Sequence, residues 1–341
     1  MKERLENSAF STLDMITNFD HDLTLEDFQQ KFDTEEACME ALFQARWPHG
    51  FRCPRCSCAH MTVITTRRLP LYECLNCRRQ TSVQAGTVME NSKTDLRKWF
   101  TAMFLVSRKQ GDLNAVKLQS IIQVTYKTAW LMLSKIRAAI SRADEKTRLS
   151  GHVRINSAAY GRVIHAMARR HPQEHPLLIG AEIDQQGNPK AIKIKQMLDE
   201  FLNGRSVNRL GIHSFIQEHV DAQLEAVFQH TVIDRATQSK RTIAKMKIVS
   251  PNRIECDVKR FSRNKCMKLK AIAKSAGTWL NDTFHGIGRK HLQKYLDEFC
   301  FRWNQSKSQT PIFVALLQIC AAAPAPTYDE LVNTVIEVCA A

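Results

Sequence analysis

The sequence has no apolar run long enough to cross a bilayer. Its most apolar stretch, residues 311–323, is too short to span the hydrocarbon core and is interrupted by Gln318. The first ten residues contain no apolar segment typical of a secretory signal, and we find no internal repeat or low-complexity tract. We therefore expect a cytoplasmic protein without a membrane partner, in which residues 311–323 form a buried helix.

The sequence also lacks the regular cysteine spacing of a secreted disulfide framework. Of eleven cysteines, six are scattered without pattern: Cys38, Cys256, Cys266, Cys300, Cys320 and Cys339. Isolated thiols of this kind are typical of a reducing cytoplasm.

Four other cysteines form a CxxC-x17-CxxC array: Cys53, Cys56, Cys74 and Cys77. Two close pairs at this separation are typical of a four-thiolate zinc site. Four sulfurs close a tetrahedron around Zn²⁺ and leave no position for a substrate, so the expected metal is structural. A disulfide pair, free buried thiols, or replacement of one ligand by Cys58 or His60 are the alternatives.

The net charge of +15 is unevenly distributed along the chain. Residues 1–50 carry a balance of −7, so the remaining chain carries +22. A field of this sign attracts polyanions, and nucleic acid is the expected partner. An anionic membrane surface is disfavoured because no basic amphipathic stretch stands out. The basic segment 235–275 fits either a phosphate-contacting surface or a solvated face.

Residues 94–140 have the periodicity of three helices, and the last two suggest a helix-turn-helix. The predicted helices cover 94–109, 112–122 and 126–140, with a turn at 123–125. The third carries an apolar stripe, with Tyr126, Lys127, Thr128, Lys135 and Arg137 largely off it. Because one helix fits the major groove and its first turn reaches base edges, we expect these five side chains to contact DNA. An ordinary helical hairpin remains the alternative.

The rest of the chain predicts acidic helices before the cysteines and an α+β region after residue 150. Thr24 and Thr34 are the expected caps of helices within 20–48. Further expectations are a charged linker over 142–150, strands at 152–155, 161–167, 177–183 and 191–194, a hairpin turn at 185–188, and helices at 196–203, 213–227 and 289–303. Three antiparallel strands followed by helices indicate an α+β core.

Three segments resemble one group of bacterial insertion-sequence transposases, the ISXO type. They read RWPHGFRCPRC followed by YECLNCRRQTSVQAGTVMENSKTDLRKWF, then AVKLQSIIQVTYKTAWLMLSKIR, and near the end WLNDTFHGIGRKHLQKYLDEFCFRWN. In that group a zinc ribbon and a helix-turn-helix precede a DDE-type, RNase H-like nuclease core. The resemblance implies double-stranded DNA as partner, a homodimer that pairs two transposon ends, and a bacterial protein associated with the nucleoid.

The same resemblance implies that the catalytic acids have been lost. DDE cores hold two Mg²⁺ ions with carboxylates. The family's first Asp aligns with Asn156 and the following Glu with Ser157, while the second falls near 226–230, which contains no acid. The third position, an Asn with a Lys two residues on, falls on Ser275 and Gly277. The other acids available are Glu182, Asp184, Asp234, Glu255 and Asp257, for which we expect surface roles.

We therefore expect a multidomain protein with a small zinc ribbon, an all-α helix-turn-helix and an α+β RNase H-like core. The expected boundaries are 1–48 for an acidic helical segment, 49–90 for the ribbon, 91–142 for the helix-turn-helix, 150–305 for the degenerate core and 306–341 for a helical tail. The expected cofactor is structural Zn²⁺, with Mg²⁺ only if catalysis is retained. The function is then that of a DNA-binding transposase homologue, or of a non-catalytic regulator or adaptor derived from one.

Overall fold

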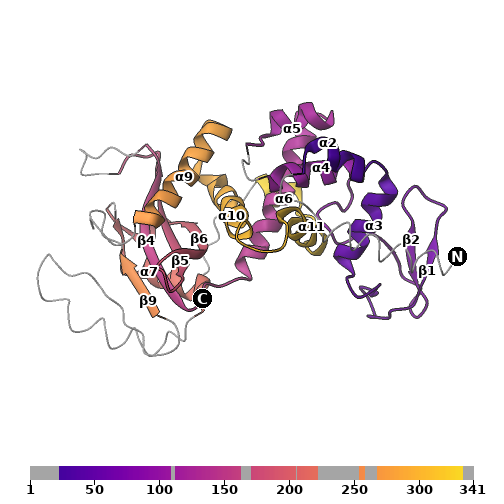
Figure 1. Ribbon diagram of the computed structural model, residues 1–341, viewed down its shortest axis with the longest axis horizontal. Helices are drawn as coiled ribbons and strands as arrows, with labels where there is room; N and C mark the ends of the chain where they lie inside the picture. The colour runs from indigo at the N-terminus through magenta and orange to yellow at the C-terminus, as the bar shows by residue number, and fades with distance from the viewer. Residues whose placement is uncertain are drawn as a thin grey trace, which may run out of the picture. The chain divides into compact units, whose positions relative to one another are not determined.

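The computed structural model describes residues 23–108, 112–162, 170–204, 206–221, 253–257 and 267–332. The chain forms two compact units. Of the described residues, the first comprises those within 23–142 and 308–332, and the second comprises those within 143–307. Helices and mixed sheets are both present, so the multidomain α+β prediction is confirmed at that level (Figure 1).

Two short acidic helices open the described part of the first unit. Helix α2 spans Leu25–Lys31, and its N-cap Thr24 forms a reciprocal capping box with Asp27. Helix α3 spans Glu35–Arg46 and is capped by Thr34, whose hydroxyl accepts the Ala37 N–H at 3.2 Å. Both predicted caps are confirmed, because they satisfy amide donors that a helix start leaves unpaired.

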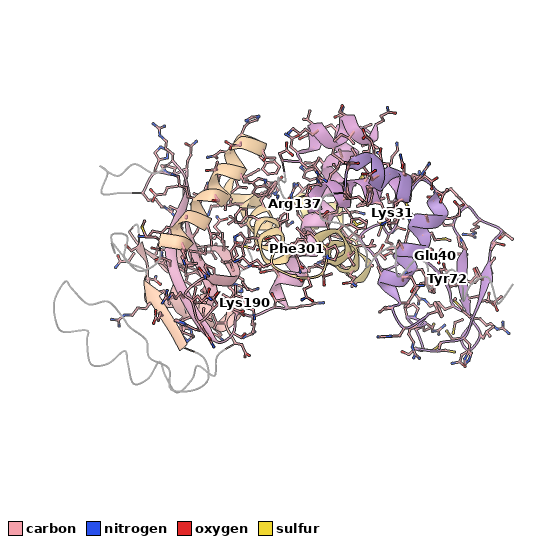
Figure 2. The ribbon with its side chains drawn as sticks, in the orientation of Figure 1. Lys31, Glu40, Tyr72, Arg137, Lys190 and Phe301 are labelled. Carbon is pink, nitrogen blue, oxygen red and sulfur yellow. The ribbon has the colours of Figure 1, made fainter. Side chains whose placement is uncertain are left out.

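The cysteine segment forms a three-stranded antiparallel sheet that is tied to α3. The strands run in the order β1 (Met61–Ile64), β2 (Leu71–Cys74) and β3 (Gln80–Ser82). Arg46 at the end of α3 donates to the carbonyls of Ser82 and Val83 at 2.8 and 3.0 Å. Tyr72 of β2, labelled in Figure 2, packs against Phe43 and Trp47 of the α3 end. The ribbon therefore shares a small core with the acidic helices.

Three helices follow, as predicted, with small differences at their ends. They are α4 (Leu96–Ser107), α5 (Ala115–Ile122) and α6 (Tyr126–Glu145). Helix α5 begins three residues later than expected because Asn114 is its N-cap and accepts the Lys117 N–H at 2.9 Å.

Residues 142–145 are not the charged linker that we predicted. Helix α6 continues to Glu145 because no Gly or Pro stops it and because Asp144 has buried partners. The Asp144 carboxylate accepts from Lys193 at 3.0 Å and Lys195 at 2.7 Å, and Lys195 also donates to Asp297 at 2.8 Å. Buried charges require such partners, so these residues belong to the second unit's interior.

The expected C-terminal tail contributes to the core of the first unit. Helix α11 (Ile312–Ala322) is buried along most of its length, which confirms the buried helix expected over 311–323. Its Phe313 contacts four aromatic rings, those of Phe28, Phe32, Phe100 and Phe104. Beyond it lies the short helix α12 (Tyr328–Val332).

The second unit is built on a four-stranded sheet in the order β6-β5-β4-β9. Strands β4 (His152–Gly161), β5 (Glu174–Ile183) and β6 (Pro189–Gln196) are antiparallel, as predicted, with the expected turn closed by Asp184 and Asn188. Strand β9 (Arg253–Asp257) runs parallel to β4. We did not predict β9, because its sequence lies in a basic stretch without clear periodicity.

The helix predicted over 196–203 is wrong. Strand β6 continues to Gln196, and a 3-10 turn (Asp199–Phe201) leads into the small hairpin of β7 (Leu202–Asn203) and β8 (Ser206–Val207). The next helix, α7 (Arg209–His219), begins earlier than expected because Asn208 caps it. Of the strand expected over 161–167, residues from 163 on lie outside the described part, as do residues 222–227 of the helix expected over 213–227.

Helices cover both faces of this sheet. Helices α9 (Met267–Phe284) and α10 (Arg289–Gln305) pack with Tyr160, Ile179 and Ile194 on one face. Helix α7 packs with Val153 and Ile155 on the other face. The helices and strands of this unit are labelled in Figure 1.

Helix α10 also covers the free edge of β6. Asn304 accepts from the Ile192 N–H at 2.8 Å and donates to its carbonyl at 3.0 Å, and Gln293 accepts from the Gln196 N–H at 2.8 Å. The side-chain amides of Asn304 and Gln293 thus bond to backbone groups of β6. On an uncovered edge strand these groups would be free to pair with another chain.

Replacing Phe313 with Ala tests the role of α11 in the first unit. We expect a loss of about 3–5 kcal/mol in unfolding free energy, because a fully packed aromatic side chain leaves a cavity among four rings. The measurement is denaturant unfolding of the full chain. Leu210→Ala, at a side chain that is 69% exposed, is the control and should change stability by less than about 0.5 kcal/mol. Equal behaviour of the two variants would contradict this role.

Candidate functional site

The four predicted metal ligands meet in the first unit. The sulfurs of Cys53, Cys56, Cys74 and Cys77 all lie within 4.8 Å of one another. The Sγ atoms of Cys53 and Cys77 are 3.5 Å apart, and those of Cys56 and Cys74 are also 3.5 Å apart. Among the described residues this is the one group of three or more His, Cys, Asp or Glu side chains close enough to share an ion.

The two CxxC turns have the same backbone geometry. Each pair is followed by a residue with positive φ, Ser57 at 58° and Arg78 at 58°. The Ser57 N–H donates to the Cys53 carbonyl at 2.8 Å, and the Arg78 N–H donates to the Cys74 carbonyl at 2.9 Å. These matched turns direct both sulfurs of each pair to the same side, so the local sequence prepares the cluster.

Backbone amides favour the thiolate form at these turns. The Cys58 N–H holds the pKa of Cys56 below its ordinary value, and the Cys77 N–H does the same for the pKa of Cys74. The Arg79 N–H also favours a thiolate at Cys77, yet the pKa of Cys77 rises to about 12 because burial and then the other three sulfurs oppose a further negative charge. A divalent cation would remove this repulsion.

The donor set fits Zn²⁺ in a structural role. Four thiolates complete a tetrahedron, so no position is left for a substrate or an attacking water. Cys58 lies outside the cluster, and its thiol contacts the His60 carbonyl at 3.9 Å. The two alternative ligands that we considered are therefore not part of the group.

The turn between α5 and α6 presents the first residues of α6 to solvent. Gln123 ends α5 in the left-handed conformation, at φ 51°, and the Thr125 hydroxyl accepts the Thr128 N–H at 3.2 Å. Tyr126 is 53% exposed and Lys127 is also exposed. Of the five side chains expected on DNA, Tyr126 and Lys127 are thus the most accessible, and Thr128 is half-buried.

The two remaining residues of that group lie deeper. Lys135 is half-buried, and burial lowers the pKa of its ammonium group. Arg137, labelled in Figure 2, is only 3% exposed, so our expectation that its side chain meets DNA needs correction. Its position borders the buried stripe of Ala129, Leu133 and Ile136, so the buried face of this helix is wider than the apolar stripe.

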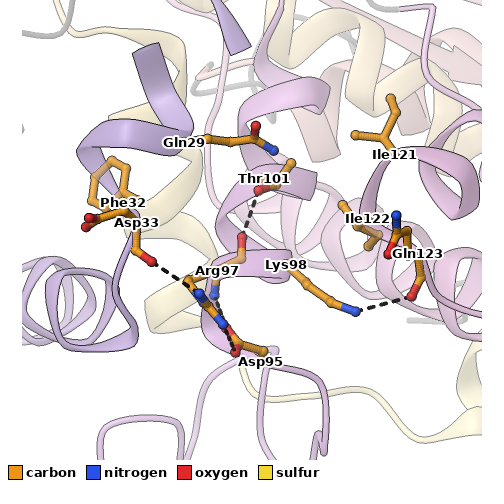
Figure 3. A pocket seen from close by; sticks show the side chains of 10 residues that line it. All are labelled: Gln29, Phe32, Asp33, Asp95, Arg97, Lys98, Thr101, Ile121, Ile122 and Gln123. Atoms are coloured by element: carbon orange, nitrogen blue, oxygen red, sulfur yellow. Dashed lines mark hydrogen bonds and ion pairs between the residues drawn. The ribbon is translucent and has the colours of Figure 1, made fainter. Parts of the chain in front are cut away.

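A hollow of about 340 Å³ lies beside this turn, between α2, α4 and the end of α5. Lys98 donates to the Gln123 carbonyl at 3.2 Å, and Arg97 pairs with Asp95 at 3.0 Å while donating to the Asp33 carbonyl at 3.2 Å (Figure 3). Both cations are therefore engaged within the protein, and Lys98 holds the strained residue that starts the turn.

Asn156, at the position of the family's first Asp, is buried in the middle of β4. The residue is 0% exposed, and neither its amide oxygen nor its amide nitrogen has a hydrogen-bond partner among the described residues. Its neighbours across the sheet are Ile179 on β5 and Asp257 on β9. An unpaired buried amide costs free energy, about 1–3 kcal/mol.

Three of the acids named from the sequence have hydrogen-bond or ion-pair partners within the described residues. Glu255 accepts from Arg154 at 3.0 Å and lies 3.7 Å from His152. Glu182 accepts the Ser150 N–H at 2.7 Å, and Asp184 accepts the Asn188 N–H at 2.7 Å. These three carboxylates have structural roles, so they form no metal site with Asn156.

The remaining family positions add no carboxylate to this sheet. Ser275 and Gly277 lie on α9, where the Ser275 hydroxyl donates to the Ala271 carbonyl at 3.0 Å. A Cβ on Gly277 would lie 3.7 Å from the ring of Tyr160, so α9 passes close to β4 at this point. Residues 226–230, Asp234 and most of the basic segment 235–275 lie outside the described residues.

Comparison with known proteins gives two likenesses. Residues 33–80 match the family described as the transposase zinc-ribbon domain. A segment of 126 residues, 37% of this chain, is 31% identical to an "Uncharacterized protein in transposable element ISH50" of Halobacterium salinarum. The likeness covers 42% of that halobacterial protein. No solved structure matches the chain.

These likenesses support a relation to insertion-sequence transposases and identify the cysteine segment as a zinc ribbon. Within the described residues, no helix has the length and apolar character needed to span a membrane.

Removing one thiolate tests the metal centre. We expect Cys56→Ser to lose bound zinc and unfold the ribbon, because three thiolates no longer close the tetrahedron. Zinc per chain is measured by elemental analysis after purification with zinc present. Cys58→Ser is the matched control and should keep one zinc; similar zinc loss in both variants would contradict the assignment.

Replacing Asn156 with the similarly shaped Leu tests the unpaired amide. We expect the unfolding free energy to stay unchanged or rise by about 1–2 kcal/mol, since a buried group without partners is removed. Denaturant unfolding gives the value. A loss above about 1 kcal/mol would mean that the amide has a partner that stabilises the fold.

Proposed function

We propose that this protein is a transposase-derived DNA-binding protein that holds duplex DNA without cutting it. One contrast carries the proposal: the thiolate cluster is complete, whereas Asn156 at the first catalytic position is uncharged, buried and without a hydrogen-bond partner in the described ranges. Uniform sequence decay would damage both features. Retention of the binding parts alone favours a function based on binding, as a regulator or adaptor.

The helices α5 and α6 are proposed to act as a helix-turn-helix. A three-residue turn separates them, and the exposed Tyr126 and Lys127 stand in the first turn of the second helix. That turn is the part of such a helix that reaches base edges and phosphates in the major groove.

The ribbon supplies a second basic surface for the same duplex. Residues 49–82 contain six arginines and a single acid, Glu73; the arginines are Arg52, Arg55, Arg67, Arg68, Arg78 and Arg79. Arg68 pairs with Glu35 and Arg78 with Glu73, while the excess of positive charge favours contact with phosphates.

The second unit is proposed to be an RNase H-like core without its metal chemistry. Three antiparallel strands, a fourth strand parallel to the first and helices on both faces agree with that architecture. Catalysis there requires carboxylates that clamp two Mg²⁺ ions on the scissile phosphate. Asn156 offers no charge and, within the described part of the chain, no exposed surface to a hydrated Mg²⁺ ion.

An active transposase is the second candidate. Asp257 is in register with Asn156 on the neighbouring strand, which places one acid position beside the lost one. This candidate requires two further acids from residues outside the described part of the chain.

A binding and cleavage assay separates the two candidates. Purified protein is incubated with duplex DNA that carries inverted repeats, in the presence of Mg²⁺ or Mn²⁺. We expect retention of the DNA without nicking, and we expect Asn156→Asp alone to leave cleavage absent because the other two family positions lack their expected residues. Metal-dependent cleavage at the repeat ends by the natural sequence would overturn the non-catalytic proposal.

Lys127→Ala tests the role of α6 in that binding. We expect weaker binding to all duplex sequences and a salt slope reduced by about one, since one phosphate contact is removed. Binding is measured by fluorescence anisotropy over a range of salt concentrations. Lys146→Ala, just beyond the C-terminal end of α6, is the control, and identical salt slopes for the two variants would rule out the assigned role of Lys127.

A further inference from the structure

The C-terminal segment 324–332 lies against α6, the helix that the proposed function places on DNA. Arg142 of α6 donates to the Pro324 carbonyl at 2.6 Å, and its second terminal nitrogen lies 3.6 Å from the Glu330 carboxylate. The segment directly follows the buried helix α11, whose packing in the first unit fixes where the segment begins.

The aromatic ring of Tyr328 reaches the beginning of α6. Its centroid is 6.4 Å from that of Trp130, in an edge-on arrangement, and the Lys127 ammonium lies 5.8 Å from it. At about 100° per residue, Lys127, Trp130 and Arg142 fall within roughly a third of the helix circumference. The segment therefore follows one side of α6, including a residue expected to contact DNA.

Local interactions hold this short segment in a defined conformation. The Thr327 hydroxyl accepts the Glu330 N–H at 3.2 Å, and the Glu330 carboxylate accepts the Thr327 N–H at 2.9 Å, which is a capping box. Pro326 is buried and Leu331 is only 2% exposed. Asp329 and Glu330 remain at the surface.

This arrangement places Tyr328 at the beginning of α6 and two negative charges in the same segment, with Glu330 beside Arg142 towards the C-terminal end of the helix. A duplex that docks along α6 brings phosphates towards this acidic segment, and like charges repel. A phosphate that approaches Lys127 also competes with the ring of Tyr328, because an aromatic ring attracts an ammonium group that lies over its face.

We propose that segment 324–332 is an autoinhibitory strap that lowers the DNA affinity of α6. This inference rests on the proposed DNA-binding role of that helix. With the strap in place, duplexes that bind weakly and without sequence specificity are disfavoured. A ligand that displaces or neutralises the segment raises DNA affinity.

The test is the double variant Asp329→Asn, Glu330→Gln in the full chain. The probe is a labelled random-sequence duplex of about three helical turns, with anisotropy read at about 50 and about 200 mM salt. We expect about fivefold tighter binding at the lower salt and a smaller gain at the higher, because the repulsion is screened. Gln can still accept the Thr327 N–H, so the capping hydrogen bond is kept.

The control removes the same charge elsewhere in the first unit. Glu26→Gln, Glu36→Gln changes exposed acids in the first turns of α2 and α3 and should give a clearly smaller gain. A chain ending at Ala323 lacks the whole segment and should bind at least as tightly as the double variant. If truncation disturbs folding, the double variant decides.

The possible results distinguish failure of the strap from failure of the proposed DNA-binding function. Tighter binding by the double variant than by its control supports the strap. Binding by the natural sequence with equal affinities for both double variants overturns the strap and leaves the proposed function in place. Absence of duplex binding by the natural sequence and by both double variants overturns both.

Discussion

Four cysteine sulfurs within 4.8 Å of one another are the constraint on which the first unit depends. Their thiolates repel, and only a shared cation satisfies all four. The strands around them are short, so metal and the α3 contacts together define the ribbon. Arg46 of α3 bonds to the ribbon backbone, and Tyr72 of the ribbon packs on α3, so the ribbon is fixed to the acidic helices. Helix α4 packs on those helices. A structural metal thus contributes to positioning the helices proposed to meet DNA.

The return of the chain after residue 307 is the second organising feature. Phe313 lies among aromatic side chains from α2 and α4, although roughly two hundred residues or more separate them in sequence. The unit proposed to bind DNA therefore combines helices from before residue 146 with α11 from after residue 307. The same return brings segment 324–332 beside α6, so a contact that stabilises the unit also places acidic residues near its basic surface.

Local signals in the sequence were sufficient for much of this arrangement. The caps at Thr24 and Thr34, the CxxC spacing and the apolar stripe of α6 depend on residues close in sequence, and each appears in the structure. The features that we missed depend on distant partners. Strand β9 is defined by pairing with β4, whose Arg154 is 101 residues from Glu255. Likewise, nothing local to Asp144 indicates its lysine partners, and nothing local to Arg137 indicates its burial.

The proposed function has two parts: a zinc-dependent unit binds DNA, and the second unit holds no Mg²⁺ ion. Titration of the zinc-loaded protein with Mn²⁺, followed by the paramagnetic resonance of free ion, tests it most directly because no DNA sequence has to be known. We expect one tightly held zinc per chain and no Mn²⁺ binding stronger than the weak association of exposed carboxylates. Stoichiometric binding of one or two Mn²⁺ ions, abolished by changing Asp257, would contradict it.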